Sequence, residues 1–237
     1  EFNLDNYRVV AENSVFWHAF LVTLSVVIVG TLINMVLTVI TSYPLSRDHL
    51  KGRRIMLLLI VFTMIFQAPM VPTYMVVKSV GLLNTFWALI IPMALSAFNM
   101  ILCVTFYRSL PEELFEAARV DGMSEYRIVW KIVVPLSLPI TMTLVLFYSV
   151  GHWNNILAPL LYITDTKFRT LQLYLYNIVA QTNINESLSG IQDMTLDFSP
   201  QGLQMATIVT ATVPIVLVYP FVQRHFIKGA LIGSVKG

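Results

Sequence analysis

Residues 55–66 read IMLLLIVFTMIF, a run without a single charged side chain. The uncharged stretch continues to residue 77 and ends at Lys78, so it reaches the roughly 20 apolar residues that a helix needs to cross a bilayer. Its apolar residues do not alternate with polar ones, as they would in a strand of a transmembrane barrel. Because lipid cannot hydrogen-bond the backbone, we expect residues 55–77 to form a membrane-spanning helix.

Four further stretches share this character, which predicts an all-α, polytopic membrane helix bundle with five spans in this chain. The spans are expected at about residues 19–46, 55–77, 79–107, 132–158 and 201–223. The composition agrees, because 57% of the residues are hydrophobic and only 12% are charged, about half the charged share of a soluble domain. Membrane lipid is therefore an expected partner, whereas a net charge of +2 is too small and scattered for a nucleic-acid-binding surface.

The residue types that build metal and catalytic sites are sparse. Cys103 is the only cysteine and lies in an apolar run, which excludes an internal disulfide framework. The four histidines are far apart along the chain and lack the spacing of a metal site, so none is predicted. No nucleophile elbow or pair of catalytic carboxylates is present, and we therefore expect the chain not to be an enzyme.

Lysine and arginine predict the orientation, because they gather on the cytoplasmic side of membrane proteins. Eleven of the fifteen lie in the loop 47–54, the loop 108–135 or the tail 224–237. We therefore place these segments, and the C-terminus, in the cytoplasm, with the segment 1–18 and the loop 162–200 outside. An external start without a signal peptide is best explained by an earlier span, so we expect six helices in the complete protein.

The predicted cytoplasmic loop has its own helical pattern, YRSLPEELFEAARVDGMSEYRIVWKIVVPLSLP (107–139). Ser109 and Glu112 have the spacing of a capping box at a helix start. Gly122 is the residue type that ends a helix, and Ser124 can cap a second helix that runs through Trp130. The sequence thus predicts a helix, a glycine corner and a helix. Such an element either rests on the lipid headgroups or docks in a groove of a soluble partner.

Within this loop, Glu116-Ala117-Ala118, followed by Gly122, Ile132 and Pro135, resemble the EAA loop of ABC-importer permeases. The family pattern is EAA, three residues, G, nine residues and I-x-L-P, and the chain departs from it only in having Val134 for the leucine. Further segments resemble the maltose-permease-like sugar branch, over a likeness that covers about residues 13–237. They are SYPLSRDHLKGRR (42–54), GLLNT (81–85), WNNILAPL (153–160), RTLQLYL (169–175) and VQRHFIKGALIGSVKG (222–237).

The resemblance implies a permease subunit in the bacterial inner membrane. Its expected partners are a second permease subunit, two ATPase subunits, and an external solute-binding protein, periplasmic or lipid-anchored, that delivers an oligosaccharide. The residues implied to couple the chain to the ATPase are Glu116, Ala117, Ala118, Asp121 and Gly122. The residues of the tail implied to reach into the ATPase dimer are Lys228, Gly229, Gly233 and Lys236. GSVKG lacks the spacing of a phosphate-binding loop, so we expect no cofactor in this chain and place ATP and Mg²⁺ on the ATPase subunits.

Polar and aromatic residues at membrane depth are candidates for the substrate pathway, because such residues are costly in lipid. They are Asn34, Gln67, Asn99, Tyr148, Ser149, Trp153, Asn154 and Asn155. The part from Tyr148 to Asn155 matches the family's Trp-Asn motif, and aromatic rings stack on sugars while amides bind hydroxyl groups. The alternative for each residue is a hydrogen bond between helices.

The chain's ending and its long external loop resemble permeases for oligosaccharides of complex polysaccharides, some of which carry acidic fragments such as alginate or pectin oligouronides. The spans show no ring of basic residues that would demand an anionic substrate. An ion- or proton-coupled secondary carrier is the alternative function. Such carriers often place ionisable residues at mid-membrane, and the predicted spans have none there, which argues against a carrier. A membrane-embedded enzyme would need a convergent catalytic set, which the sequence does not show.

Overall fold

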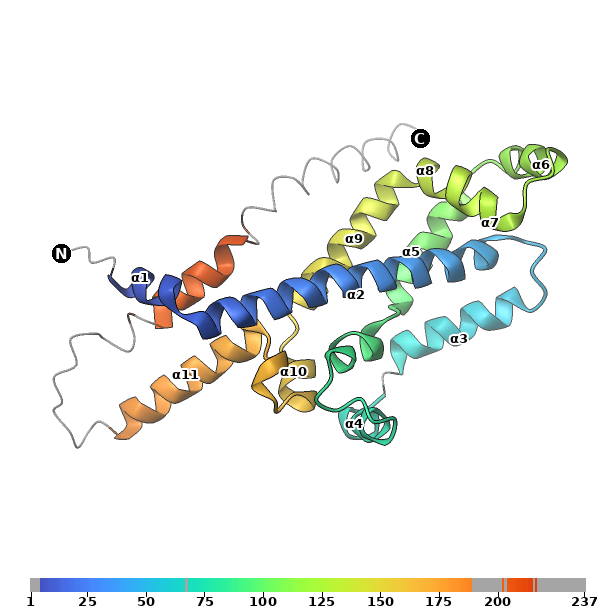
Figure 1. The fold of residues 1–237 in the computed structure, drawn as a ribbon. Coiled ribbons are helices and arrows are strands. Elements are labelled where there is room, and N and C mark those ends of the chain that lie inside the picture. The colour runs from blue at the N-terminus through green and yellow to red at the C-terminus, as the bar shows by residue number, and fades with distance from the viewer. Residues whose placement is uncertain (1–4, 67, 189–201, 203, 215, 217–237) are drawn as a thin grey trace.

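The computed structural model describes residues 5–66, 68–188, 202, 204–214 and 216, and these are mostly helical and contain no strand (Figure 1). The α-helices are α1 (Asp5–Glu12), α2 (Ser14–Ser46), α3 (Arg53–Ile65), α4 (Met70–Ser79), α5 (Ala97–Arg108), α6 (Glu113–Val120), α7 (Glu125–Ile128), α8 (Val134–Leu136), α9 (Leu138–Trp153), α10 (Leu157–Tyr162) and α11 (Leu171–Leu188). Short 3₁₀ turns cover Phe86–Leu89, Ile91–Met93 and Thr166–Phe168, and Val129–Val133 form a π-helical turn. The all-α prediction is confirmed for the described residues.

Helix α2 is the axis of the bundle, and it contains the first predicted span. Its 33 residues give a length of about 50 Å, which exceeds the roughly 30 Å of the lipid core. The helix begins at Ser14, five residues before the predicted start, because the Asn13 side chain accepts hydrogen bonds from the backbone N–H groups of Val15 and Phe16. Helices α5 and α9 pack against α2, while α6 and α7 lie at its C-terminal end (Figure 1).

The other predicted spans are interrupted, so the count of five is not confirmed. Within the described residues only α2 is long and apolar enough to span alone, and at most four spans result if each bent helix pair counts as one. Residues Phe86–Met93 and α5 meet at 51°, and the stretch Glu125–Leu136 meets α9 at 87°. Residues 79–107 therefore do not form one continuous helix. Of the predicted span 201–223, residues 202, 204–214 and 216 are described, and these are helical.

Prolines and a left-handed turn account for these interruptions. Pro69 precedes α4, and Pro139 sits in the first turn of α9, where a proline is tolerated because its missing N–H has no helical partner. Ser137, just before α9, has a φ of −100° and a ψ of 19°, which is not helical. Gly81 has φ of +72°, which ends the helical course after α4. Sequence reasoning that counts uncharged residues cannot see these bends, because proline and glycine change the backbone without adding charge.

The predicted external loop 162–200 contains helix α11, which the sequence reading missed. Its apolar part, Leu171–Ala180, is too short to span a bilayer, so a search for membrane-spanning stretches does not detect it. The Thr23 hydroxyl of α2 accepts a hydrogen bond of 2.8 Å from the backbone N–H of Leu171, and Leu171 is fully buried. Helix α11 thus packs on the N-terminal half of α2, at the opposite end of the bundle from α6 (Figure 1).

A glycine allows α2 and α9 to approach each other closely. A Cβ atom at Gly30 would lie 2.6 Å from Nε2 of the His152 ring, a distance that real side chains do not adopt. That same Nε2 lies 2.9 Å from Oδ1 of Asn34, one turn further along α2, and both residues are buried. His152 is therefore a packing residue at the α2–α9 contact, and its ring has little room to move.

We expect Gly30→Ala to destabilise the helix bundle by about 1–3 kcal/mol, because the new methyl group displaces the His152 ring from Asn34. Thermal unfolding of the purified protein in detergent measures the effect. Gly151→Ala is the matched control, since nothing lies within 4 Å of a Cβ atom there and α9 favours alanine over glycine. Equal unfolding temperatures for the two variants would contradict the close approach at Gly30.

Candidate coupling loop and polar helix interface

The loop between α5 and α9 has the predicted arrangement of helix, glycine corner and helix. Helix α6 ends at Val120, Gly122 adopts φ of +73°, and α7 starts at Glu125. The predicted capping box is wrong, because Glu112 is the residue before α6 and makes no side-chain cap. The Ser109 hydroxyl instead donates to the carbonyl of Phe106 in the last turn of α5. Ser124 precedes α7, also without a side-chain cap.

Helix α6 has one face buried in the bundle and one face exposed. Phe115 and Ala118 are 0% and 4% exposed and belong to the same core cluster as Tyr43 of α2, Tyr107 of α5 and Leu144 of α9. This cluster contains side chains of the loop and of three long helices, so the loop packs as part of the bundle. Ala118 is small where α6 approaches the chain's own helices, and it is not on the surface that a partner would touch.

The exposed face carries the other residues that the resemblance singles out, namely Glu116, Ala117, Asp121 and Gly122. Two further residues flank the same corner and were missed from the sequence. Val120 is 87% exposed and Tyr126 is 78% exposed, the largest values among the large hydrophobic side chains of the described residues. Val120 follows Glu116 by four residues and thus shares its helix face, a spacing that could have revealed it.

Polar contacts connect α7 to α6 and α2. Nε of Arg119 donates to Oε1 of Glu125 at 3.0 Å, and the Tyr43 hydroxyl donates to Oε2 of the same carboxylate at 2.5 Å. Burial raises the pKa of Glu125, but the hydrogen bonds from Tyr43 and Arg119 outweigh it and lower this pKa below its usual value. The ionised form of Glu125 therefore holds the two short helices against the end of α2.

This lowered pKa predicts a loss of stability in acid. The contribution of Glu125 is complete above its ordinary pKa of about 4.5 and disappears as the pH falls through the lower pKa of the folded protein. Because the carboxylate is half exposed, we expect Glu125→Gln to lower the unfolding temperature at pH 7 by only about 1–3 °C, and this gap to close in acid. Thermal unfolding scans at several pH values measure the gap. A gap that stays constant down to pH 3 would contradict this role of Glu125.

Several candidates for the substrate pathway are hydrogen-bonded between helices. The Tyr148 hydroxyl shares a hydrogen bond of 2.7 Å with Thr38, and the Ser149 hydroxyl shares one of 3.2 Å with Thr31. Asn34 donates to the carbonyl of Met93 at 2.7 Å. Trp153 is 8% exposed, and its ring forms a T-shaped pair with the ring of Phe20. These contacts favour a packing role for the four residues over a direct contact with substrate.

The remaining candidates lie apart. Asn155 is half-buried, and its side-chain oxygen accepts from the backbone N–H of Ala158, while Asn99 is buried at the start of α5. Asn154, just after α9, is exposed and is the best placed of the group to meet a solute. Gln67 and the tail residues Lys228, Gly229, Gly233 and Lys236 lie outside the described residues.

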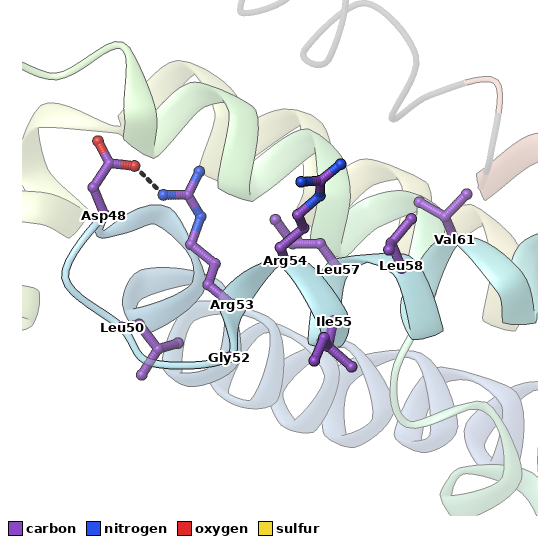
Figure 2. A pocket seen from close by; sticks show the side chains of 9 residues that line it. All are labelled: Asp48, Leu50, Gly52, Arg53, Arg54, Ile55, Leu57, Leu58 and Val61. Carbon is purple, nitrogen blue, oxygen red and sulfur yellow. Dashed lines mark hydrogen bonds and ion pairs between the residues drawn. The ribbon is translucent and has the colours of Figure 1, made fainter.

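A pocket of about 720 Å³ lies beside the start of α3 (Figure 2). Its lining consists of Asp48, Leu50, Gly52, Arg53, Arg54, Ile55, Leu57, Leu58 and Val61, with Arg53 and Asp48 forming an ion pair. None of the predicted site residues lines it. No group of three or more His, Cys, Asp or Glu side chains in the described ranges is arranged to hold a metal ion.

Comparison with known proteins gives a consistent picture. Residues 22–231 match the family model described as "Binding-protein-dependent transport system inner membrane component". The chain is 44% identical to Protein LplC of Bacillus subtilis (strain 168), over all of this chain and 80% of that protein. It is 43% identical to the polygalacturonan/rhamnogalacturonan transport system permease protein YtcP of the same organism, over all of this chain and 82% of that protein.

A solved structure is similar to this chain in both sequence and fold. It is described as the crystal structure of a bacterial ABC transporter involved in the import of the acidic polysaccharide alginate. The TM-score is 0.87 at 30% identity, over 95% of this chain and 80% of that chain. The chain therefore belongs to the family of binding-protein-dependent transport system inner membrane components.

Proposed function

We propose that this chain is the permease subunit of an ABC importer for oligosaccharides of acidic polysaccharides, and that it couples to its ATPase subunits through the exposed face of α6 and α7. Membership of the family and the sugar-transport permeases among its relatives make it an ABC-importer permease for sugars. The observation that carries the coupling proposal is the division of this loop into two faces. One face is packed into the helix bundle, and the other is exposed although it carries hydrophobic side chains.

The exposed face has the chemistry of a docking surface. Val120 and Tyr126 would supply apolar contact area, and the small Ala117 would allow a partner to approach the backbone closely. Glu116 and Asp121 form no ion pair within the described part of the chain, unlike Glu112 and Glu125. Their charges therefore remain available for basic residues of an ATPase, where a partly buried ion pair would fix the register of docking.

The buried face provides the mechanical link. Phe115 and Ile128 are both 0% exposed and pack against residues of α2, α5 and α9 in one core cluster. Close-packed clusters resist deformation, so a displacement of the loop is passed to the helices that it contacts. Movement of the ATPase subunits would then rock this subunit against a second permease and expose the pathway alternately to the two sides of the membrane.

The substrate class is supported by two relatives. One is a polygalacturonan/rhamnogalacturonan transport system permease, and the other is an importer for alginate, so each serves a polysaccharide rich in acidic sugars. No Lys or Arg lies between residues 14 and 46 or within α9. We therefore propose that discrimination of the acidic groups falls mainly to the solute-binding protein and the second permease, with Asn154 of this chain as a sugar contact.

The secondary carrier remains the alternative because His152 is an ionisable group buried in α9. Its ring is hydrogen-bonded to Asn34 and lies against Gly30, which is a packing arrangement and not that of a group lining a water-filled path. The two functions differ in their energy source. Uptake that persists in cells depleted of ATP but holding a proton gradient would favour the carrier, whereas uptake that stops would favour the importer.

The proposed assembly is tested by purification in mild detergent through a tag on this chain, followed by mass spectrometry. We expect an ATPase subunit and a second permease to be recovered with it, and recovery of this chain alone would contradict the importer. The recovered complex, placed in liposomes with its solute-binding protein, then tests the substrate. Oligogalacturonides or alginate oligosaccharides should stimulate ATP hydrolysis more than malto-oligosaccharides of equal length, and the reverse order would overturn the acidic substrate class.

A further inference from the structure

We propose that Arg47 is a positioning residue that clamps the start of α6 to the ends of α2 and α5, and so transmits movement of the coupling loop to the membrane helices. The inference rests on the proposed function, because it takes α6 and α7 as the elements that the ATPase moves. It adds a residue outside the loop itself. Arg47 lies immediately after α2 and is 3% exposed, an unusual burial for an arginine.

The guanidinium group of Arg47 bonds to three segments at once. Nη2 donates to the carbonyl of Tyr107 in the last turn of α5 at 2.7 Å. Nη1 donates to Oε2 of Glu112, the residue before α6, at 2.8 Å. Nε donates to the hydroxyl of Ser46 at the end of α2 at 3.1 Å. One rigid group thus fixes the relative positions of two long helices and the coupling loop.

An aromatic contact completes the site. The guanidinium carbon lies 3.8 Å from the centre of the Phe115 ring and 5.4 Å from that of Tyr43. Phe115 belongs to α6 and is fully buried, so the stack holds the inner face of the loop as well as its first residue. Only arginine combines a planar face for stacking with several donors in a fixed fork, whereas lysine offers a single compact charge.

The charge of Arg47 suits this position. It lies at the C-terminal ends of both α2 and α5, where the helix dipoles favour a cation. The Glu112 side chain is 53% exposed, so the ion pair by itself contributes little to stability. The main effect of the arrangement is therefore geometric, because the buried guanidinium must keep all its partners to remain satisfied.

A second series of polar contacts connects the loop to α2. The other carboxylate oxygen of Glu112, Oε1, lies 3.7 Å from Nη1 of Arg119. Arg119 in turn donates a hydrogen bond to Glu125, and Glu125 accepts a second one from the hydroxyl of Tyr43. Tyr43 and Arg47 are four residues apart and lie on the same face at the end of α2. The loop is therefore held to the end of α2 at two points, through α6 and through α7.

The clamp is tested by spin labels on cysteines at Ile40 and Glu113, two exposed positions on α2 and α6. The native Cys103 is buried, which leaves the two introduced thiols as the labelling sites. In the purified complex we expect a narrow distribution of label distances, and a clearly broader one in Arg47→Gln and Arg47→Lys. Arg53→Gln is the matched control, because Arg53 lies in the same cytoplasmic region but pairs only with the exposed Asp48.

The functional readout is the amount of oligosaccharide transported per ATP hydrolysed. We expect Arg47→Gln to lower this ratio about fivefold or more, with the ATPase subunits still bound, because the exposed docking face is unchanged. Glu112→Ala removes the exposed partner and provides a variant that folds if Arg47→Gln does not. It should also broaden the distribution of label distances. Unchanged distances and an unchanged ratio in these variants, with the ATPase present, would overturn the clamp alone. Absence of the ATPase from the unaltered complex would instead overturn the proposed function, and the transmission role with it.

Discussion

Glu116→Lys is expected to lower oligosaccharide-stimulated ATP hydrolysis at least about tenfold, because it replaces a charge that would pair with a basic residue of the ATPase by one that repels it. Glu116 is exposed and forms no ion pair within the described part of the chain, so the folded helix bundle should not be affected. The measurement is the ATPase rate of the reconstituted complex with and without solute-binding protein and sugar. Thermal unfolding of the same sample reports on the fold.

Glu12→Lys is the matched control for this variant. It makes the same change of charge at another exposed carboxylate, which pairs only with Arg8 and lies at the opposite end of α2 (Figure 1). The control should retain the stimulated rate. A Glu116→Lys complex that hydrolyses ATP as fast as the control would contradict docking through the exposed face of α6.

Gly122→Val is expected to reduce the stimulated ATPase rate by a factor of about 5 to 30. Gly122 adopts φ of +73°, a conformation that costs an L-residue about 1–2 kcal/mol and a β-branched residue more. Nothing lies within 4 Å of a Cβ atom at this position, so the effect arises from the backbone and not from a steric clash. A strained corner would change the angle between α6 and α7, and therefore the shape of the proposed docking surface.

Gly122→Asn separates conformation from side-chain size. Asparagine adopts the left-handed region more readily than other residues, so this variant should retain much more of the stimulated rate than Gly122→Val. Equal losses in the two variants would show that the partner rejects any side chain at the corner. Equal retention would contradict the need for a left-handed turn between the helices.

The loop between α5 and α9 shows how far the sequence can predict a local fold. The helix, the corner and the second helix follow from local signals, because Gly122 and the periodicity of α6 act over a few residues. The division of Ala117 and Ala118 between the exposed and buried faces depends on what α6 packs against, which is tertiary information. The same applies to Arg47, whose partners at Tyr107 and Glu112 lie 60 and 65 residues further along the chain.

The membrane helices show what the sequence could predict only in part. Absence of charge predicted the apolar stretches, and α2 confirms the first of them. Hydropathy could not predict the left-handed turn at Gly81 or the bends before α5 and α9, nor helix α11 in a segment expected to be a loop. It also could not distinguish pathway residues from packing residues, since the polar side chains of Tyr148 and Ser149 form hydrogen bonds to α2.

In the proposed mechanism, the exposed face around Gly122 docks on an ATPase subunit. The most direct test of this docking is a photo-crosslinking residue placed at Val120, which is 87% exposed, and in parallel at Ile55 of α3, which is 65% exposed. After illumination of the assembled complex, we predict an adduct between this chain and the ATPase from position 120 and none from position 55. No adduct from position 120, in a complex that contains the ATPase, would contradict the account.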